Sequence, residues 1–245
     1  IITSATLRDI VNEEKVQDWD QADVRLGASH LIAPPKRQSF ASPFDYKKQA
    51  KVFIVTDINR DDPDQVASAY RELFLASGGH ALGLFTAIHR LKSTYHKLIE
   101  PITDAGLTLL AQHIDTMDTG TLVDIFRHQP KSILLGTDAL RDGVDVPGEA
   151  LKLLVFDRIP WPRPNILHKR RRAAFGKNAY DDMVTRLRLK QAFGRLIRRD
   201  EDKGVFVMLD ARTPTRLLSA FPEGVGIKRL GLKQVIDESR LFFKG

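Results

Sequence analysis

The residues with the clearest chemical potential are the arginines near position 195. The stretch Gln191-Ala192-Phe193-Gly194-Arg195-Leu196-Ile197-Arg198-Arg199 is predicted to be helical, which places Gln191, Arg195 and Arg198 on one face. The opposite face carries Leu189, Phe193 and Leu196 and is expected to pack inward. Guanidinium forks match phosphate oxygens, and a glycine beside them permits close approach of a ligand. The pattern therefore favours a polyphosphate-binding face, although arginine-rich helix faces are also common as plain solvated surface.

A glycine-punctuated acidic loop stands about 50 residues before these arginines. It follows a short aliphatic run, Ile133-Leu134-Leu135, and carries Asp142, Gly143 and Asp145. Two carboxylates around a glycine can cap a helix or organise an Asx turn without any further role. The spacing alone does not decide between this structural role and a role in chemistry.

Composition limits the classes of protein that remain. The chain has 245 residues, 42% of them hydrophobic and 28% charged, which is enough for a sizeable core. It has no cysteine, which excludes disulfides and thiolate metal sites, and its seven histidines show no metal-ligand spacing. No apolar run approaches the roughly 20 residues that span a bilayer, so we expect no membrane partner and a cytoplasmic location. The net charge of +7 favours a polyanionic partner.

Short aliphatic runs alternate with helical patterns from residue 51 onward, which is typical of a parallel sheet covered on both faces. Proline at 63 and the glycines at 78 and 79 are expected to open and close the first helix of this region. The predicted strands cover residues 51–57, 80–86, 107–112, 132–135, 151–156 and 204–210, and the predicted helices cover 66–76, 89–99, 119–128, 180–199 and 232–243. The predicted fold class is therefore α/β, with an open and mainly parallel sheet that has helices on both faces.

Polar residues follow several of these strands directly. Thr86, Thr137-Asp138 and Asp210 stand just past strand ends, where ligands of open α/β sheets bind. The first seven residues, Ile1 to Leu7, read as the end of a buried strand without its sheet, and residues 8–50 read as a surface connector. With no GxxxxGK[ST] phosphate loop and no acidic DExH quartet, the chain is expected to be a piece of a longer protein.

Several motifs, taken in order, resemble those of a known family. They are Thr3-Ser4-Ala5-Thr6, Ser42-Pro43-Phe44-Asp45-Tyr46, Leu84-Phe85-Thr86-Ala87, Gly136 to Gly148, Arg158 to Pro164, Gln191 to Arg198, and Leu209-Asp210-Ala211-Arg212. Together they resemble the later motifs of superfamily 2 helicases, and most closely the DinG-like branch of the XPD family. The chain departs from that pattern at Arg141 and Asp142, where the family tends to carry an aromatic residue and a glutamate, and at Ala87, where serine is common.

The resemblance implies the second RecA-like motor lobe of a P-loop NTPase-type helicase, at residues 45–245, preceded by the end of a first-lobe motif and a connector at 1–44. ATP with magnesium would be held mostly by the absent first lobe, which is the expected partner. Arg195 and Arg198 would meet the γ-phosphate as arginine fingers. Gln191, Gly143, Asp145 and Asp142 would contact the nucleotide or hold the arginines. The isolated chain, lacking the first lobe, is expected not to turn over ATP.

The other implied partner is single-stranded DNA, which the parent would traverse from 5′ to 3′. Thr86, Arg90 and Thr137 would bind its phosphates, although helix or turn capping equally explains Thr137. Trp161 is a candidate for base stacking or for a partly buried core position. Arg170 and Arg171, in the basic run of residues 168–172, are expected near DNA, and a solvated helix face is the alternative. The alternative function is a RecA-like nucleic-acid-binding module without catalysis.

Overall fold

A computed structural model describes residues 1–4, 7–10, 17–137, 140 and 151–244. The chain divides into two compact units. The sheet unit comprises residues 44–159, 192–213 and 223–245, and the second unit comprises 1–43, 160–191 and 214–222. Each unit is described by itself.

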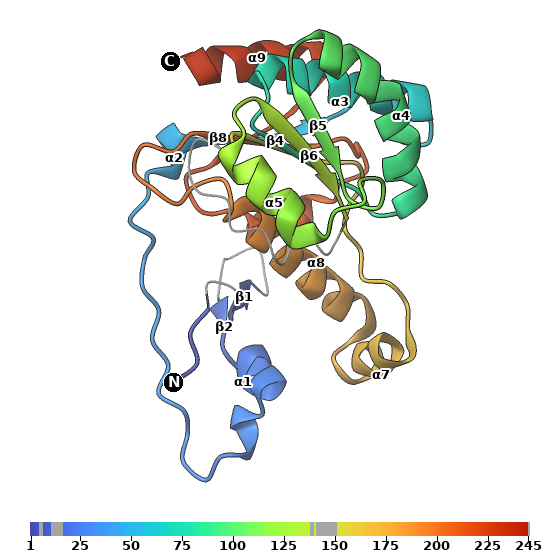
Figure 1. The fold of residues 1–245 in the computed structure, drawn as a ribbon. Helices are drawn as coiled ribbons and strands as arrows, with labels where there is room; N and C mark the ends of the chain where they lie inside the picture. The colour runs from blue at the N-terminus through green and yellow to red at the C-terminus, as the bar shows by residue number, and fades with distance from the viewer. Residues whose placement is uncertain (5–6, 11–16, 138–139, 141–150, 245) are drawn as a thin grey trace. The chain divides into compact units, whose positions relative to one another are not determined.

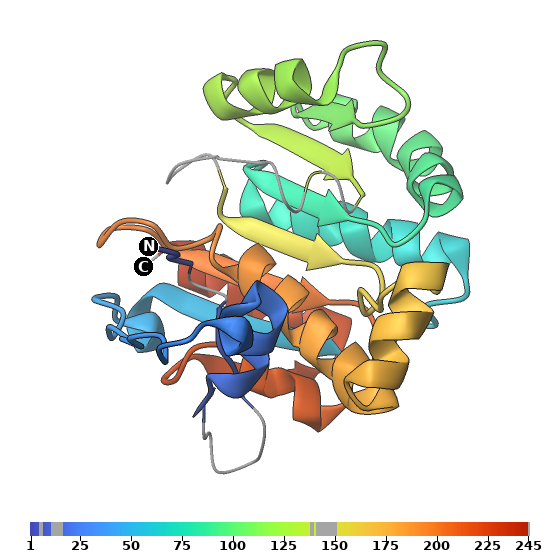
Figure 2. The same ribbon diagram turned by 90° about the horizontal axis from the view of Figure 1, so that it is seen from below.

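The sheet unit is built on seven parallel strands in the order β5-β6-β4-β7-β8-β3-β9. Figure 2 shows the strand arrows pointing the same way. The predicted open parallel sheet is confirmed. The strands are β3 (Ala50–Val55), β4 (Ala81–Leu84), β5 (Thr108–Ala111), β6 (Ser132–Gly136), β7 (Leu153–Phe156), β8 (Gly204–Met208) and β9 (Gly226–Leu230).

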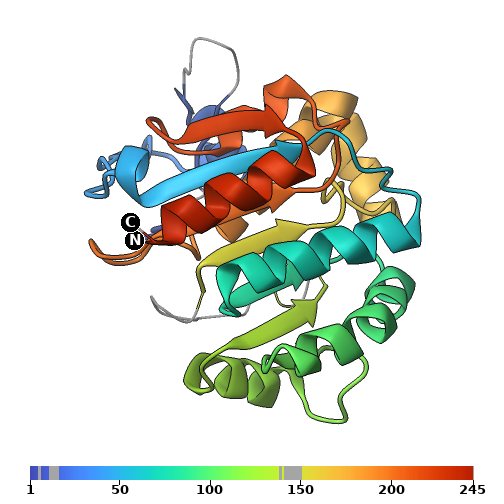
Figure 3. The same ribbon diagram turned by 90° about the horizontal axis from the view of Figure 1, so that it is seen from above.

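Helices cover both faces of this sheet. On one face lie α3 (Pro63–Ser77), α4 (Ile88–Asp104) and α9 (Leu232–Lys244), as seen in Figure 3. The chain reverses its direction across the sheet after β5, so a right-handed crossover places α5 (Thr119–His128) on the other face (Figure 1). A short helix, α2 (Tyr46–Gln49), leads into β3. The helices α3, α4, α5 and α9 agree with the predictions.

The ends of α3 follow from local sequence chemistry. The Asp62 carboxylate accepts hydrogen bonds from the N–H groups of Asp64 and Gln65, and Pro63 occupies the first turn. Gly78 ends the helix in the left-handed conformation, with φ of 68°. The apolar face of α3 then packs against the sheet, and the largest buried residues of this contact are Tyr70, Leu73 and Phe74.

The structure differs from the sequence predictions in several places, among them the three that follow. The helix predicted over 180–199 is α8 (Lys177–Phe193), so its C-terminal end was placed six residues too late. Strand β9 was not predicted because its residues are mostly exposed and include Lys228 and Arg229, as suits a sheet edge. Ile1 and Ile2 are exposed and belong to no strand.

The second unit contains short elements and a helical hairpin. The hairpin is formed by α7 (Ile166–Ala174) and α8. The Asp181 carboxylate joins them, since it accepts a hydrogen bond from Arg172 Nε at 2.8 Å and lies 3.0 Å from His168 Nε2. The remaining elements are β1 (Asp9–Ile10), β2 (Gln17–Asp18), α1 (Asp20–Leu26), a 3₁₀ turn η1 (Ala28–His30) and a second 3₁₀ turn η3 (Thr215–Ala220). Within the described ranges, no helix is both long enough and apolar enough to cross a bilayer.

Candidate functional site

The candidate finger arginines lie just beyond the end of α8. After Phe193 the backbone turns tightly, with the Arg195 N–H donating to the Ala192 carbonyl at 3.2 Å and the Leu196 N–H donating to Phe193 at 2.9 Å. Arg198 follows in a bend. The prediction that Gln191, Arg195 and Arg198 share a continuous helical face is therefore wrong, and only Gln191 remains helical. The predicted apolar set is buried, since Leu189, Phe193 and Leu196 are each 1% exposed.

A carboxylate binds the backbone beyond the end of the helix. Asp202 Oδ2 accepts hydrogen bonds from the N–H groups of Arg198 at 2.8 Å and Arg199 at 2.9 Å. In a longer helix these two N–H groups would donate to backbone carbonyls four residues earlier. Gly194 also costs about 1 kcal/mol in a helix interior relative to alanine. Asp202 was not predicted to matter, because nothing in its local pattern shows which N–H groups it binds.

The surroundings of Arg198 favour an anionic partner. The side chain is half-buried, and this burial lowers the pKa of Arg198. The cation of Arg127 on α5 acts on the pKa in the same direction, and the Asp202 carboxylate opposes both. A guanidinium stays protonated, so the loss of water and the second cation instead raise its tendency to bind an anion such as phosphate.

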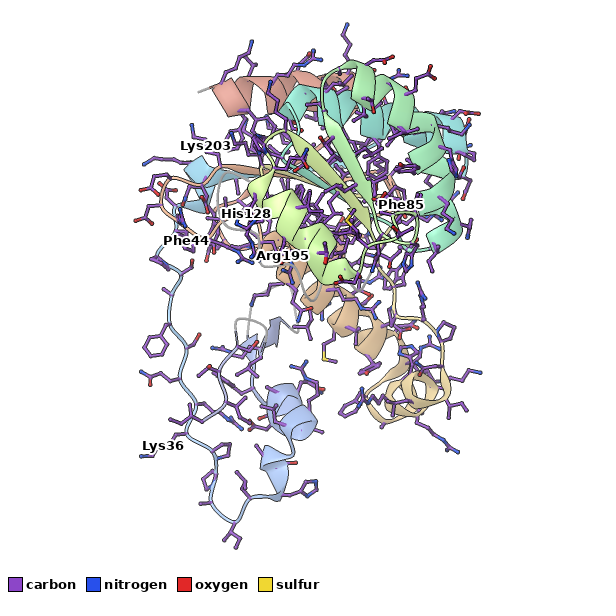
Figure 4. All side chains as sticks on the ribbon, in the orientation of Figure 1. Lys36, Phe44, Phe85, His128, Arg195 and Lys203 are labelled. Carbon is purple, nitrogen blue, oxygen red and sulfur yellow. The ribbon has the colours of Figure 1, made fainter. Side chains whose placement is uncertain are left out.

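Residues 194–203 lead into the start of β8. They therefore lie toward the side of the sheet where the parallel strands begin, which we call the amino edge, and the strands end at the carboxyl edge. In Figure 4, Lys203, just before β8, and Phe85, just after β4, mark the two edges. Thr86, Thr137 and Asp210 follow strands and lie at the carboxyl edge. The structure thus separates the candidate finger arginines from the strand-end polar residues.

A buried ionic network occupies the carboxyl edge beside β4 and β7. Asp157, which is fully buried, accepts from the Thr86 N–H at 3.0 Å and from Arg90 Nε at 2.6 Å. Burial raises the pKa of Asp157, and Arg90 acts against this rise. Arg90 also donates to the Arg60 carbonyl at 2.9 Å. Two of the three guanidinium nitrogens of Arg90 therefore donate within the protein.

The same network continues to β8. Arg60 pairs with the fully buried carboxylate of Asp210, and Arg158 pairs with Asp61. Arg158 also donates to the Arg60 carbonyl at 3.3 Å. Of these residues, Asp210 and Arg158 stand in motifs singled out in the sequence, whereas Arg60 and Asp61 do not. A usable signal for Asp157 existed, namely a carboxylate directly after a buried aliphatic strand.

Thr137, at the end of β6, is hydrogen-bonded within the sheet unit. Its N–H and its hydroxyl donate to Gln112 Oε1 at 3.0 Å and 3.1 Å, and its hydroxyl lies 3.3 Å from His113 Nε2. Its carbonyl accepts from the Leu140 N–H at 2.9 Å, which is the bond of a turn. The predicted loop residues Asp138, Asp142, Gly143 and Asp145 lie outside the described residues.

The remaining candidates belong to the second unit. Trp161 is 38% exposed, and its carbonyl accepts from Arg188 Nη1 at 2.9 Å. Arg170 and Arg171 are exposed on α7. Gln191 is exposed in the last turn of α8. In the part of the chain that the structure describes, no group of three or more His, Cys, Asp or Glu residues is placed to hold a metal ion.

Comparison with known proteins identifies the family. The model of the helicase C-terminal domain matches residues 70–225. The ATP-dependent helicase DinG of Mycobacterium tuberculosis (strain ATCC 25177 / H37Ra) is 35% identical over 192 residues, which are 74% of this chain and 28% of that protein. The 3′-5′ exonuclease DinG of Bacillus subtilis (strain 168) is 31% identical over 207 residues, which are 78% of this chain and 22% of that protein. The chain spans about a quarter of the length of these two relatives.

Solved structures agree on the fold. An XPD helicase superposes with a TM-score of 0.55 at 16% identity, over 74% of this chain and 35% of that chain. Dbp5 of S. cerevisiae, bound to RNA and ADP BeF3, gives a TM-score of 0.60 at 14% identity, over 92% of this chain and 52% of that chain. The sheet and its helices therefore have the fold of RecA-like helicase lobes. The chain belongs to the helicase C-terminal domain family, as the C-terminal lobe of a DinG-like helicase.

Proposed function

We propose that this chain is the second motor lobe of an ATP-dependent DNA helicase and supplies arginines to ATP held by a first lobe. The observation that carries the proposal is the placement of Arg198 in a bend whose backbone is fixed by Asp202, with its side chain partly buried. A fixed, partly desolvated arginine is suited to charge that develops on a transferring phosphoryl group.

Arg195 is the second finger candidate in this proposal. It lies in the turn between the end of α8 and Arg198, so the two arginines are carried on one short segment. Their side chains would bind phosphate oxygens, and the absent first lobe would supply the phosphate loop and the ligands of magnesium. The bound magnesium would neutralise phosphate charge.

Single-stranded DNA is the proposed nucleic-acid partner. A motor that moves along any sequence must contact mainly the backbone, so the contacts are expected to be with phosphates. The exposed cations of α7, Arg170 and Arg171, are available for such contacts. At the carboxyl edge, Thr86 and Arg90 are held in place by Asp157, which would keep them ordered when a strand binds.

The test uses the full-length parent protein with Arg195→Ala and Arg198→Ala. Each variant is expected to lose about 10³-fold or more of its DNA-stimulated ATPase rate, because that is the scale of arginine-finger losses. Single-stranded DNA binding, measured by fluorescence anisotropy, should stay near the parent value. The isolated chain should show no magnesium-dependent, DNA-stimulated ATPase. If both variants keep full ATPase activity, the motor proposal is wrong, and retained DNA binding would then favour a non-catalytic nucleic-acid-binding module.

A further inference from the structure

The side-chain amide of Gln49 lies in an unusual position within the sheet unit. Its Nε2 is 2.9 Å from the carbonyl oxygen of Arg199, 3.0 Å from that of Asp200 and 3.3 Å from that of Asp202. The residue is 7% exposed. An amide nitrogen has two hydrogens, so three carbonyls can converge on it only through shared hydrogen bonds. One buried side chain thus binds three backbone carbonyls of the same turn.

Asp202 binds the same turn as a hydrogen-bond acceptor, whereas Gln49 binds it as a donor. Its carboxylate accepts from the N–H groups of Arg198 and Arg199, while Gln49 donates to the carbonyls of residues 199, 200 and 202. The donors and the acceptors of the segment that carries Arg198 are therefore bound by two side chains. We call this pair, Gln49 and Asp202, the turn clamp.

The sheet fixes the geometry of the turn clamp. Gln49 directly precedes β3, residues 199–202 lie just before β8, and these parallel strands pair with Ala50 opposite Gly204. The short helix that carries Gln49 is anchored by the Tyr46 ring, which lies 5.8 Å from the Phe193 ring at the end of α8. Strand pairing and ring packing together leave little freedom between the amide and the turn.

We propose that Gln49 is a positioning residue for the phosphoryl-transfer step and acts through Arg198. This inference rests on the proposed function, in which the Arg198 guanidinium meets the γ-phosphate. A misplacement of about 1 Å in a catalytic group can cost about 100-fold in rate. Loss of the amide releases three carbonyls and lets the turn move, which displaces Arg198 without removing its charge.

The variants are Gln49→Met and Gln49→Glu in the full-length parent. Methionine keeps the length of the side chain but has no N–H donor, and glutamate turns a carboxylate toward three carbonyl oxygens. Gln49→Met is expected to lower kcat of the DNA-stimulated ATPase about 10- to 100-fold, and Gln49→Glu at least as much. KM for ATP and Kd for single-stranded DNA should change less than about threefold, because finger contacts act mainly in the transition state.

Gln129→Met is the matched control. Gln129 also donates its amide N–H, to Thr108 Oγ1 at 2.9 Å, but at an exposed position at the end of α5. The control variant should keep the parent kcat. Hydrogen exchange followed by mass spectrometry should show faster exchange over residues 198–203 in Gln49→Met, with the β-strands unchanged.

A double-mutant cycle separates positioning from general damage. In an Arg198→Lys background, whose residual activity allows measurement, Gln49→Met should lower kcat less than about threefold further. If Gln49→Met lowers kcat by the same factor in both backgrounds, or leaves kcat unchanged while Arg198→Ala abolishes it, the positioning role is wrong and the motor proposal stands. If Arg198→Ala itself leaves the ATPase unchanged, the proposed function is wrong.

Discussion

Replacement of Arg90 by methionine tests the energetics of the carboxyl edge. The change removes the cation that faces Asp157 and keeps a similar apolar stem. Asp157 is fully buried and Arg90 has 14% of its side chain exposed, so little water screens the pair. With charge centres roughly 4 Å apart and an effective dielectric constant of about 20, the lost attraction is about 4 kcal/mol. Removing one member of a buried pair typically costs about 3–5 kcal/mol, which agrees.

Urea unfolding of this chain measures the effect. Because m is about 1–3 kcal/mol per molar urea, a loss of about 4 kcal/mol should lower the midpoint by more than about 1 M. Arg71→Met is the matched control, since Arg71 pairs with Glu72 at 3.0 Å on the exposed side of α3 and should contribute at most about 1 kcal/mol. Adding Asp157→Asn to Arg90→Met should recover part of the loss, because the uncompensated charge is then gone.

The stability lost in Arg90→Met should also depend on pH. Burial raises the pKa of Asp157, and without Arg90 the pKa rises further. A carboxyl with a raised pKa binds a proton more readily in the folded state, so the folded state gains stability as the pH falls through that pKa. The difference between Arg90→Met and the parent chain should therefore be larger at pH 7 than near pH 5. A small midpoint shift, or a difference that does not change with pH, would refute the idea that Arg90 compensates a buried charge.

Two further predictions concern packing and capping. Gly83→Ala should destabilise the sheet unit by about 1–3 kcal/mol in urea, because an added Cβ would lie 2.8 Å from Leu135 Cδ2 and 3.0 Å from Tyr70 Cε1; an unchanged midpoint would contradict this. Asp118 caps α5, and hydrogen bonds from the Thr121 hydroxyl and backbone hold the pKa of Asp118 below its usual value. Its stabilisation is present above the ordinary aspartate pKa and is lost as the pH falls through the lowered value. The Tm difference between Asp118→Ala and the parent chain should therefore shrink on acidification, and a constant difference would argue against the cap.

Much of the fold was predictable because it depends on local signals. The start of α3 follows from Asp62 and Pro63, and its end follows from Gly78, all within the helix or beside it. The buried strands are continuous aliphatic runs, which are typical of a parallel sheet covered on both faces. Strand β9 lacked that signal, since an edge strand with exposed residues resembles a loop in sequence.

The candidate site was predictable only in part. The sequence placed Thr86, Thr137 and Asp210 after strands, and the structure confirms those positions. It did not reveal that the hydroxyl of Thr137 is bound by Gln112, 25 residues earlier, because hydrogen-bond partners of this kind are set by strand order. The finger roles of Arg195 and Arg198 stay predictions.

By itself, the sequence determined the class of fold and the order of the motifs, and it singled out Arg195 and Arg198 as candidates for binding phosphate. These features depend on residue type and on spacing along the chain. Only the tertiary structure decided where α8 ends and what holds Arg198. Gln49 reaches the turn at residues 199–202 across about 150 positions of sequence, because β3 pairs with β8 in the sheet. Such a contact depends on two distant segments meeting in space, and no local pattern of side chains specifies it.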